Sequence, residues 1–193
     1  EELPAFIETL ETLAEWPWLA DCARLDWAVW QISGARPAKF AEGDLRRLID
    51  GDPATLVLRL APGVRRLSSA WPIVILHDAH REPHPDWAAV TQAIAQNRAQ
   101  MAWVWRPHDD LAAAPAVEPL DVATGRWVAA LDAGQTLGLA LDSAGESFDF
   151  GVWLEQAVSR GWLDGVVDMA MPSGPAHEAG THSFAGGPQS NAG

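Results

Sequence analysis

The sequence predicts an α+β protein, and three observations carry that prediction. The run "WLADCARLDWAVW", residues 18–30, repeats apolar side chains at helical spacing. Residues 55–60 alternate in polarity and residues 101–107 are rich in Trp and Val, as strands are. Residues 120–165 read as three helices separated by tight turns. With 193 residues, 48% of them hydrophobic, the chain can bury a core as one domain or two small ones.

The N-terminal part is predicted to be helical. Residues 3–14 carry apolar residues three or four apart, which predicts a short amphipathic helix that Pro17 interrupts. The second helix follows and ends at "SGARP". Its apolar stripe consists of Trp18, Cys22, Leu25 and Val29, and Trp27 and Trp30 widen it. Residues 42–53 predict one more short helical turn.

The middle of the chain gives weaker signals. After the strand at residues 55–60, Pro62 and Gly63 form a turn, and residues 64–67 are expected to return as the second strand of a hairpin. Residues 72–76 fit either a buried strand or one helical turn, because periodicity does not distinguish the two. Asp86 is the expected N-cap of a helix over residues 87–100.

The C-terminal part is predicted more sharply. Strands are expected at residues 101–107 and 116–120. Three helices follow, over residues 121–133, 136–143 and 149–161, with Gly134 ending the first and Thr136 and Asp149 capping the other two. We therefore predict a helical and small-sheet region at 1–98, a second domain at 99–168 and a mobile tail at 169–193, which is rich in Gly, Pro and Ser.

The charge argues against the DNA binding that a helix-turn-helix layout suggests. The chain has a net charge of −13, and residues 101–168 hold three basic and eleven acidic side chains. A DNA reader needs cations and amides at the start of its last helix. Here the first two turns are apolar and acidic, with only Gln156 suited to a base edge and Arg160 two turns late. This surface favours an apolar or basic peptide.

Other candidate sites are weaker. His77, His80 and His84, near Asp78 and Asp86, have the spacing of metal ligands, but two prolines interrupt a helix there, and a polar loop is the preferred interpretation. His177 and His182 are weaker still. Cys22, the single cysteine, fits an apolar packing role better than a nucleophile. Trp103 and Trp105 share one strand face and fit a core better than a base-stacking platform. We find no catalytic constellation.

The segment "EPLDVATGRWVAALDAGQTLGLALDSAGESFDFGVWLEQAVSRGWL" resembles a PqqD-type peptide-recognition element. The positions that match are Leu120, Asp121, Ala130, Leu131, Gly134, Thr136, Leu137, Ala140, Leu141, Leu154, Gly161 and Leu163. "LPAFI", "WLADCARLDWAVWQ", "LVLRLAPGVRRLSSAWPIVILHDA" and "MAWVWRP" are similar to the HvfC/methanobactin-type partner proteins, often labelled putative DNA-binding. The similarity covers roughly residues 3–168. Family members usually carry a further N-terminal helical bundle, so this sequence is expected to be a fragment, a short variant or a piece once joined to its enzyme.

The resemblance implies a C-terminal winged-helix-like domain and a non-catalytic subunit without a cofactor or metal of its own. The single cysteine, Cys22, fits a reducing cytosol, so the predicted location is cytoplasmic. Its partner would be a multinuclear non-haem iron oxidase that modifies cysteine in a ribosomally made precursor peptide. The leader of that peptide would add as a strand to the sheet edge beside the third helix. Because Pro119 lies in that edge and has no N–H, docking is expected to shift toward residues 114–118.

This interpretation predicts two sets of residues, one that binds the peptide and one that contacts the partner. The peptide-binding residues are expected to be Val117, Glu118, Leu120, Phe150, Trp153, Leu154 and Ala157. For Leu154 the core and the groove are equal alternatives, and for Trp153 the groove is preferred. The exposed part of five tryptophans is the expected partner interface, namely Trp16, Trp18, Trp27, Trp30 and Trp71. A DNA-binding transcription regulator and a His-bound metal enzyme stay open as alternatives.

Overall fold

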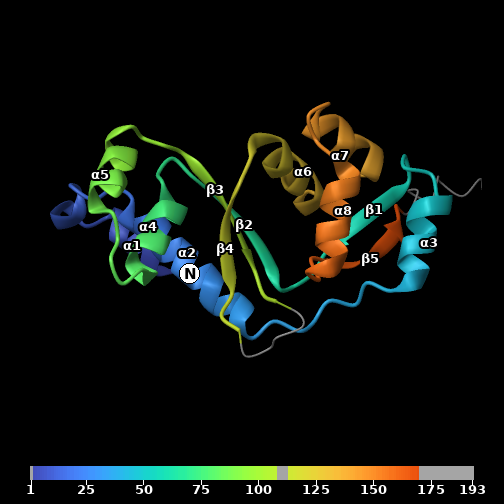
Figure 1. Ribbon diagram of the computed structural model, residues 1–193, viewed down its shortest axis with the longest axis horizontal. Coiled ribbons are helices and arrows are strands. Elements are labelled where there is room, and N and C mark those ends of the chain that lie inside the picture. Colours follow the sequence, from blue (N-terminus) through green and yellow to red (C-terminus); the bar gives the residue numbers. More distant parts are fainter. Residues whose placement is uncertain (1, 108–112, 170–193) are drawn as a thin grey trace, which may run out of the picture.

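The computed structural model describes residues 2–107 and 113–169 and confirms a mixed α+β architecture (Figure 1). The elements in order are α1 (Glu2–Glu8), the 3-10 helix η1 (Glu11–Leu13), α2 (Leu19–Ser33), α3 (Glu42–Asp50), β1 (Leu56–Leu60), β2 (Val64–Ser69), α4 (Ile73–Arg81), α5 (Trp87–Ala95), β3 (Gln100–Trp105), β4 (Ala116–Leu120), α6 (Val122–Asp132), α7 (Leu137–Ala144), α8 (Phe150–Ser159) and β5 (Leu163–Asp168). The predicted tail, apart from Met169, lies outside the described residues, as do His177 and His182.

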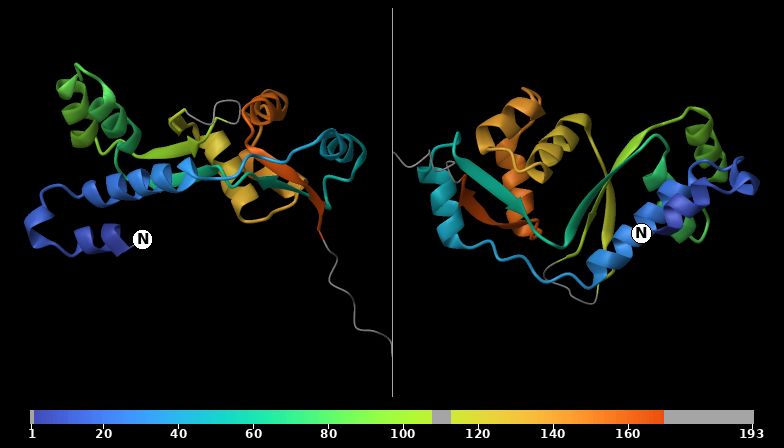
Figure 2. Two further views of the ribbon diagram at one scale, coloured as in Figure 1. Left: turned by 90° about the horizontal axis from the view of Figure 1, so that it is seen from below. Right: turned by 180° about the vertical axis from the view of Figure 1, so that it is seen from behind.

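The strands form two antiparallel sheets, one of three strands in the order β2-β3-β4 and one of two strands, β1-β5. The hairpin expected between residues 55–60 and 64–67 is therefore wrong. β1 and β2 diverge at the bend between them (Figure 2), and each pairs with a strand more than 30 residues along the chain. The Ala61 N–H donates to the Trp162 carbonyl, which keeps the end of β1 against the start of β5. A turn motif between two strands does not indicate whether each strand pairs with its neighbour or with a strand far along the chain.

Strand β5 is absent from the sequence-based prediction. Its burial pattern is irregular, with Leu163 and Val166 buried and Val167 partly exposed, and the register shifts beside Arg59 and Leu60. An irregular strand lacks the period-two alternation by which a strand is recognised. The predicted domain boundary at residues 98 and 99 falls between α5 and β3. Strands on the two sides of this boundary pair with each other, because β1 pairs with β5 and β2 pairs with β3.

Several helices differ in extent from their predictions. The expected helix over residues 3–14 is two pieces, α1 and η1. The expected single turn at 42–53 is the nine-residue α3, and the ambiguous residues 72–76 begin helix α4. α5 begins after the predicted cap, where the Asp86 carboxylate accepts from the Ala89 N–H, but it ends at Ala95. Asn97 then has a positive φ of 45°, which stops the helix.

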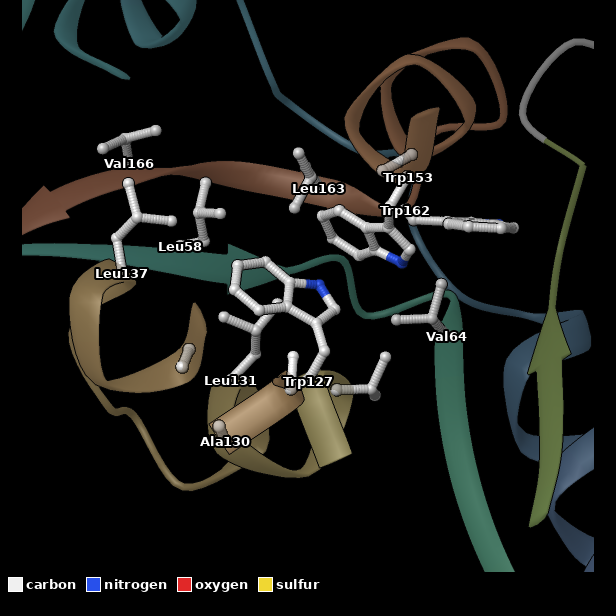
Figure 3. Packing of buried hydrophobic residues seen from close by; sticks show 14 of the residues in the cluster. Leu58, Val64, Trp127, Ala130, Leu131, Leu137, Trp153, Trp162, Leu163 and Val166 are labelled. Atoms are coloured by element: carbon white, nitrogen blue, oxygen red, sulfur yellow. The ribbon is translucent and has the colours of Figure 1, made fainter. Parts of the chain in front are cut away.

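Strand β3 separates the main hydrophobic clusters. Trp103 points into a large cluster with β1, β5 and helices α6 to α8, whereas Ala102 and Val104 point into a second cluster with α2 and α4. The alternation of a strand explains this, because successive side chains face opposite sides of the sheet. Figure 3 shows Trp127 of α6, Trp153 of α8 and Trp162 meeting in the large cluster. Trp103 is 1% exposed, so the core reading of that residue is confirmed.

Helix α2 corrects the predicted stripe. Its buried residues are Ala20, Leu25, Ala28 and Ile32, while Cys22 and Val29 are partly buried against the second cluster. Trp27 and Trp30 do not widen this stripe, because their side chains are exposed on the outside of the helix. Among the described residues, neither of these two rings belongs to a core cluster.

Candidate functional site

A groove of about 460 Å³ lies between strand β4 and helix α8. β4 contributes Glu118 and Leu120, and α8 contributes Val152, Trp153 and Gln156. The first turn of α6 closes the end nearest Leu120. The two walls of the groove, β4 and α8, lie on either side of α6 in Figure 1. Helices α6 and α7 separate these two elements in the sequence, yet β4 and α8 form one site.

Tryptophan rings form the floor of this groove. Trp103, Trp153 and Trp162 all line it. Trp103 and Trp162 meet edge to face with centroids 5.6 Å apart, and Trp153 contacts Trp127 in the same way at 5.1 Å. The indole N–H groups of these rings are buried and have no hydrogen-bond acceptor among the described residues. The faces of these aromatic rings are suited to contact with hydrophobic side chains.

The rim of the groove is acidic. Asp121 and Asp149 lie at the helix N-termini, where their carboxylates accept from the backbone N–H groups of Thr124 and Val152. The Thr124 hydroxyl also donates to Asp121 at 2.6 Å, and this bond, followed by the backbone bond, lowers the pKa of that carboxyl. The negative charge of this rim would repel phosphate.

The guanidinium of Arg160 does not line the groove but lies beside Glu118, which does. It is 3.2 Å from the Glu118 carboxylate and 5.2 Å from the centre of the Trp105 ring. It also lies 5.4 Å from the centre of the Trp162 ring. The cation is thus held between α8 and β4 by a carboxylate and two aromatic faces. The positive charge of Arg160 is balanced by the negative charge of Glu118. The carboxylates of Asp121 and Asp149 are therefore the excess negative charge of the rim.

Strand β4 has an open edge beside this groove. The Arg106 N–H donates to the Gly63 carbonyl, so the even-numbered residues of β3 bond to β2 and the odd-numbered residues bond to β4. Their partners on β4 are residues 116, 118 and 120. Val117 and Pro119 therefore direct their backbone groups outward, and no other described strand pairs with them. The edge offers one N–H and two carbonyls, since proline has no N–H.

The outer edge of β5 is closed in comparison. The Asp44 carboxylate accepts from the Val166 N–H at 3.2 Å, and the Arg47 guanidinium donates to the Val166 carbonyl at 3.3 Å. Both side chains come from α3, which covers this edge as native proteins often do. A strand added to this protein would find β5 occupied and β4 accessible.

The structure brings together only part of the predicted peptide-binding set. Glu118, Leu120 and Trp153 line the groove. Trp153 is only 5% exposed, so it belongs to both the core and the groove floor. Val117 lies on the opposite sheet face, against the second cluster, and only its backbone faces the edge. The remaining three do not line the groove: Ala157 is fully buried, and Phe150 and Leu154 pack against the large cluster.

Val152 and Gln156 are groove residues of α8 that are absent from the predicted peptide-binding set. Together with Asp149 and Trp153 they form one stripe on α8, spaced three or four residues apart. The residues predicted from the sequence lie mainly on the most apolar face of the helix, and that face packs into the hydrophobic core. The sequence pattern that could have identified these groove residues is the half-polar stripe of α8 that begins at its predicted N-cap, Asp149.

The five tryptophans of the expected partner interface separate into two groups. Trp16, Trp27 and Trp30 are 45%, 37% and 66% exposed. Trp27 and Trp30 stack with their ring centroids 4.7 Å apart on the outer face of α2. Trp18 and Trp71 are half-buried and meet edge to face at 5.7 Å. The exposed surface is therefore centred on α2 and the segment before it.

The His and Cys candidates lie apart from the groove. His77 and His80 are on α4, and His84 follows the end of that helix. No three His, Cys, Asp or Glu side chains converge as metal ligands in the described part of the chain. Cys22 packs between α2 and α4, which confirms its apolar role. Burial, followed by the charges of Asp26 and Asp21, raises the pKa of its thiol to about 11.

Comparison with known proteins gives no family for this chain, since no family model and no curated protein sequence matches it. Within residues 2–107 and 113–169, none of the helices combines the length and the apolar character that crossing a lipid bilayer requires.

Proposed function

We propose that this chain is a non-catalytic subunit that holds an extended peptide segment in the groove between β4 and α8. The single observation that carries the proposal is an open strand edge beside an apolar groove with an acidic rim. The ligand is a leader segment of a ribosomally made precursor peptide, which the chain presents to a multinuclear iron oxidase acting on cysteine. We assign no cofactor to this chain.

The order of the elements supports this function. A three-stranded antiparallel sheet is followed by three helices, and the last helix faces the last strand of the sheet. This is the arrangement expected of a winged-helix-like, PqqD-type recognition element. The charge supports a peptide over a nucleic acid, because Asp121 and Asp149 remain as excess negative charge beside α8.

The energetics require side-chain anchors. The three outward groups of Val117 and Pro119 would give about 1 kcal/mol each in net hydrogen bonding. Ordering each peptide residue costs about 1–2 kcal/mol. One or two apolar side chains buried against Val152 and Trp153, at about 1.5–3 kcal/mol each, therefore decide the affinity. An added strand directs alternate side chains to one face, so we expect a ligand with apolar residues at every second position.

The test is fluorescence anisotropy with a labelled peptide of about ten residues that alternates leucine and lysine. The chain is expected to bind it, and Val152→Ser is expected to weaken binding about fivefold to tenfold through lost apolar contact. The matched control is Val158→Ser, a change of a valine on the same helix that is 41% exposed, against 52% for Val152, and does not line the groove. This control is expected to leave the affinity unchanged.

A second peptide tests strand addition itself. N-methylation at alternate backbone positions removes the donors of one peptide edge while the side chains stay the same, and it is expected to abolish binding. Equal binding of the methylated peptide, or equal effects of the two valine variants, would contradict the groove. Capture of duplex DNA at cellular ionic strength in preference to the peptide would instead favour the transcription regulator.

The partner interface is the second part of this proposal. The stacked pair Trp27 and Trp30, together with Trp16, is the surface we assign to the oxidase, because large exposed aromatics are typical of protein interfaces. The measurement is the iron content of the complex that co-purifies with the chain, with and without the double change Trp27→Ser and Trp30→Ser. Loss of iron in the double variant is expected, and iron retained at the parent level would refute this assignment.

A further inference from the structure

A second pocket, of about 760 Å³, lies at the bend between β1 and β2. The two strands form its arms, and the C-terminal end of α6 and part of β5 complete it. Figure 2 shows the strands diverging from this bend, with α6 between them. None of its lining residues lines the groove between β4 and α8, so the two sites are separate.

The pocket concentrates positive charge in an acidic protein. Four of the chain's twelve arginines line it: Arg36, Arg59, Arg65 and Arg66. Two of them are matched by carboxylates that also line the pocket. Arg36 makes a bidentate pair with Asp164, at 2.9 and 2.7 Å, and Arg66 lies 3.3 Å from Asp132.

The other two guanidinium groups form no ion pair with a carboxylate among the described residues, although, after the hydrogen bond from Arg36, the charge of Arg59 helps to lower the pKa of Asp164. Arg59 and Arg65 are both exposed on the strand arms. Arg65 donates only to the Val64 carbonyl of its own strand. The lining therefore carries two net positive charges, while the chain as a whole carries −13. Exposed cations that border one cavity indicate an anionic ligand.

We propose that this pocket is a second docking site, which binds an acidic peptide segment of a partner protein through Arg59 and Arg65. A planar guanidinium binds a carboxylate through two parallel hydrogen bonds, and such bonds are stronger than neutral ones. Val57, Leu60 and Val167 add apolar walls beside the arginines. The walls fit a peptide that combines carboxylates with apolar side chains, rather than an isolated phosphate ion.

The surroundings also favour a peptide over a nucleic acid. A nucleic acid carries a charge at every phosphate, so it would extend from the pocket across a surface with excess negative charge. A short acidic segment confines its charge to the pocket. The leader groove and this pocket have opposite charge preferences, and each can therefore be tested without the other.

The probe is a labelled peptide of about eight residues that alternates glutamate and leucine, measured by anisotropy with the full chain. The parent is expected to bind it, and the double change Arg59→Gln and Arg65→Gln is expected to weaken binding about tenfold or more. The matched control is Arg46→Gln, which changes an exposed arginine of α3 outside the pocket and should have no effect.

A third variant reverses the sign of the effect. Asp132→Asn removes the carboxylate beside Arg66, and it is expected to tighten binding by about threefold, a result that misfolding cannot produce. Three outcomes would each overturn the proposal: equal binding of the peptide with glutamine in place of glutamate, no effect of the arginine changes, or stronger binding of an oligonucleotide of equal charge. Val152→Ser should not affect this peptide, which separates the pocket from the groove.

Discussion

Cys22 illustrates how the surroundings of one residue decide its chemistry. The thiol lies beside Leu25, Ile73 and Leu76 between α2 and α4. Burial there, with the negative charges of Asp26 and Asp21, raises its pKa from 9.0 to about 11. A raised thiol pKa favours the protonated form. The stability gained by keeping the thiol neutral is present below pH 9.0 and is lost as the pH rises through about 11.

We therefore predict slow alkylation of Cys22 in the folded protein. At about pH 8, the thiolate fraction is about a hundredfold lower than for an ordinary thiol, and the greater nucleophilicity of a high-pKa thiolate recovers about tenfold of the rate. The net expectation is a rate at least about tenfold below that of the urea-unfolded chain, measured with iodoacetamide and mass spectrometry. Equal rates in the two states would mean that the thiol is an accessible nucleophile.

At the scale of elements, the helix caps position the groove. α6, α7 and α8 each begin where a side-chain oxygen accepts a backbone N–H, from Asp121, Thr136 and Asp149. The caps at Thr136 and Asp149 were predicted from the sequence because the interaction is local, between residues three apart. Of the three, Asp121 has the additional bond from the Thr124 hydroxyl, and its pKa is lowered as a result.

Removal of this cap has a predicted cost. Asp121→Ala is expected to lower the free energy of unfolding by about 1 kcal/mol, measured by urea denaturation at neutral pH. Because the folded pKa is lowered, the charged carboxylate stabilises the fold above the unfolded value near 3.8, and this contribution is lost as the pH falls below it. The difference between the parent and the variant should therefore shrink in acid. Asp121→Asn, which keeps an accepting oxygen, is the control.

Other elements were not predictable from local signals. β5 has no alternation, and α4 begins within a run of apolar residues that fits a helix or a strand equally well. The Gln100 side chain accepts from the Val74 and Ile75 N–H groups, at 3.0 and 3.3 Å, and thereby satisfies the start of α4. This partner is about 25 residues along the chain, so no local pattern contains it.

At the scale of the whole molecule, the first strands are structural partners of the C-terminal part. β1 forms the only described pairing of β5, and β2 pairs with β3 along six residues. Leu56, Leu58 and Val64 are buried in the same cluster as Trp127 and Trp153. The three helices behind the groove thus pack on residues that precede the predicted boundary at 98 and 99.

We predict that residues 99–168 alone do not fold cooperatively. This piece lacks β1 and β2, so it would expose the buried faces of β5 and β3 and lose part of the core of α6 to α8. Thermal unfolding followed by circular dichroism should show a sharp transition for the full chain and none for the piece. A cooperative transition in the piece would support the boundary that the sequence suggested.

The sequence by itself determined the fold class, the N-caps of α7 and α8 and an acidic, apolar character for the last helix. These properties depend on composition, on periodicity and on contacts within one turn of chain. Only the tertiary structure decided which strands pair, which edge stays open and which face of α8 borders the groove. Val152 and Gln156, rather than Phe150 and Ala157, border it because packing in the large hydrophobic cluster takes the most apolar face of the helix. The arginine pocket likewise required the fold, since Arg36 and Asp164 meet only when β5 returns beside β1.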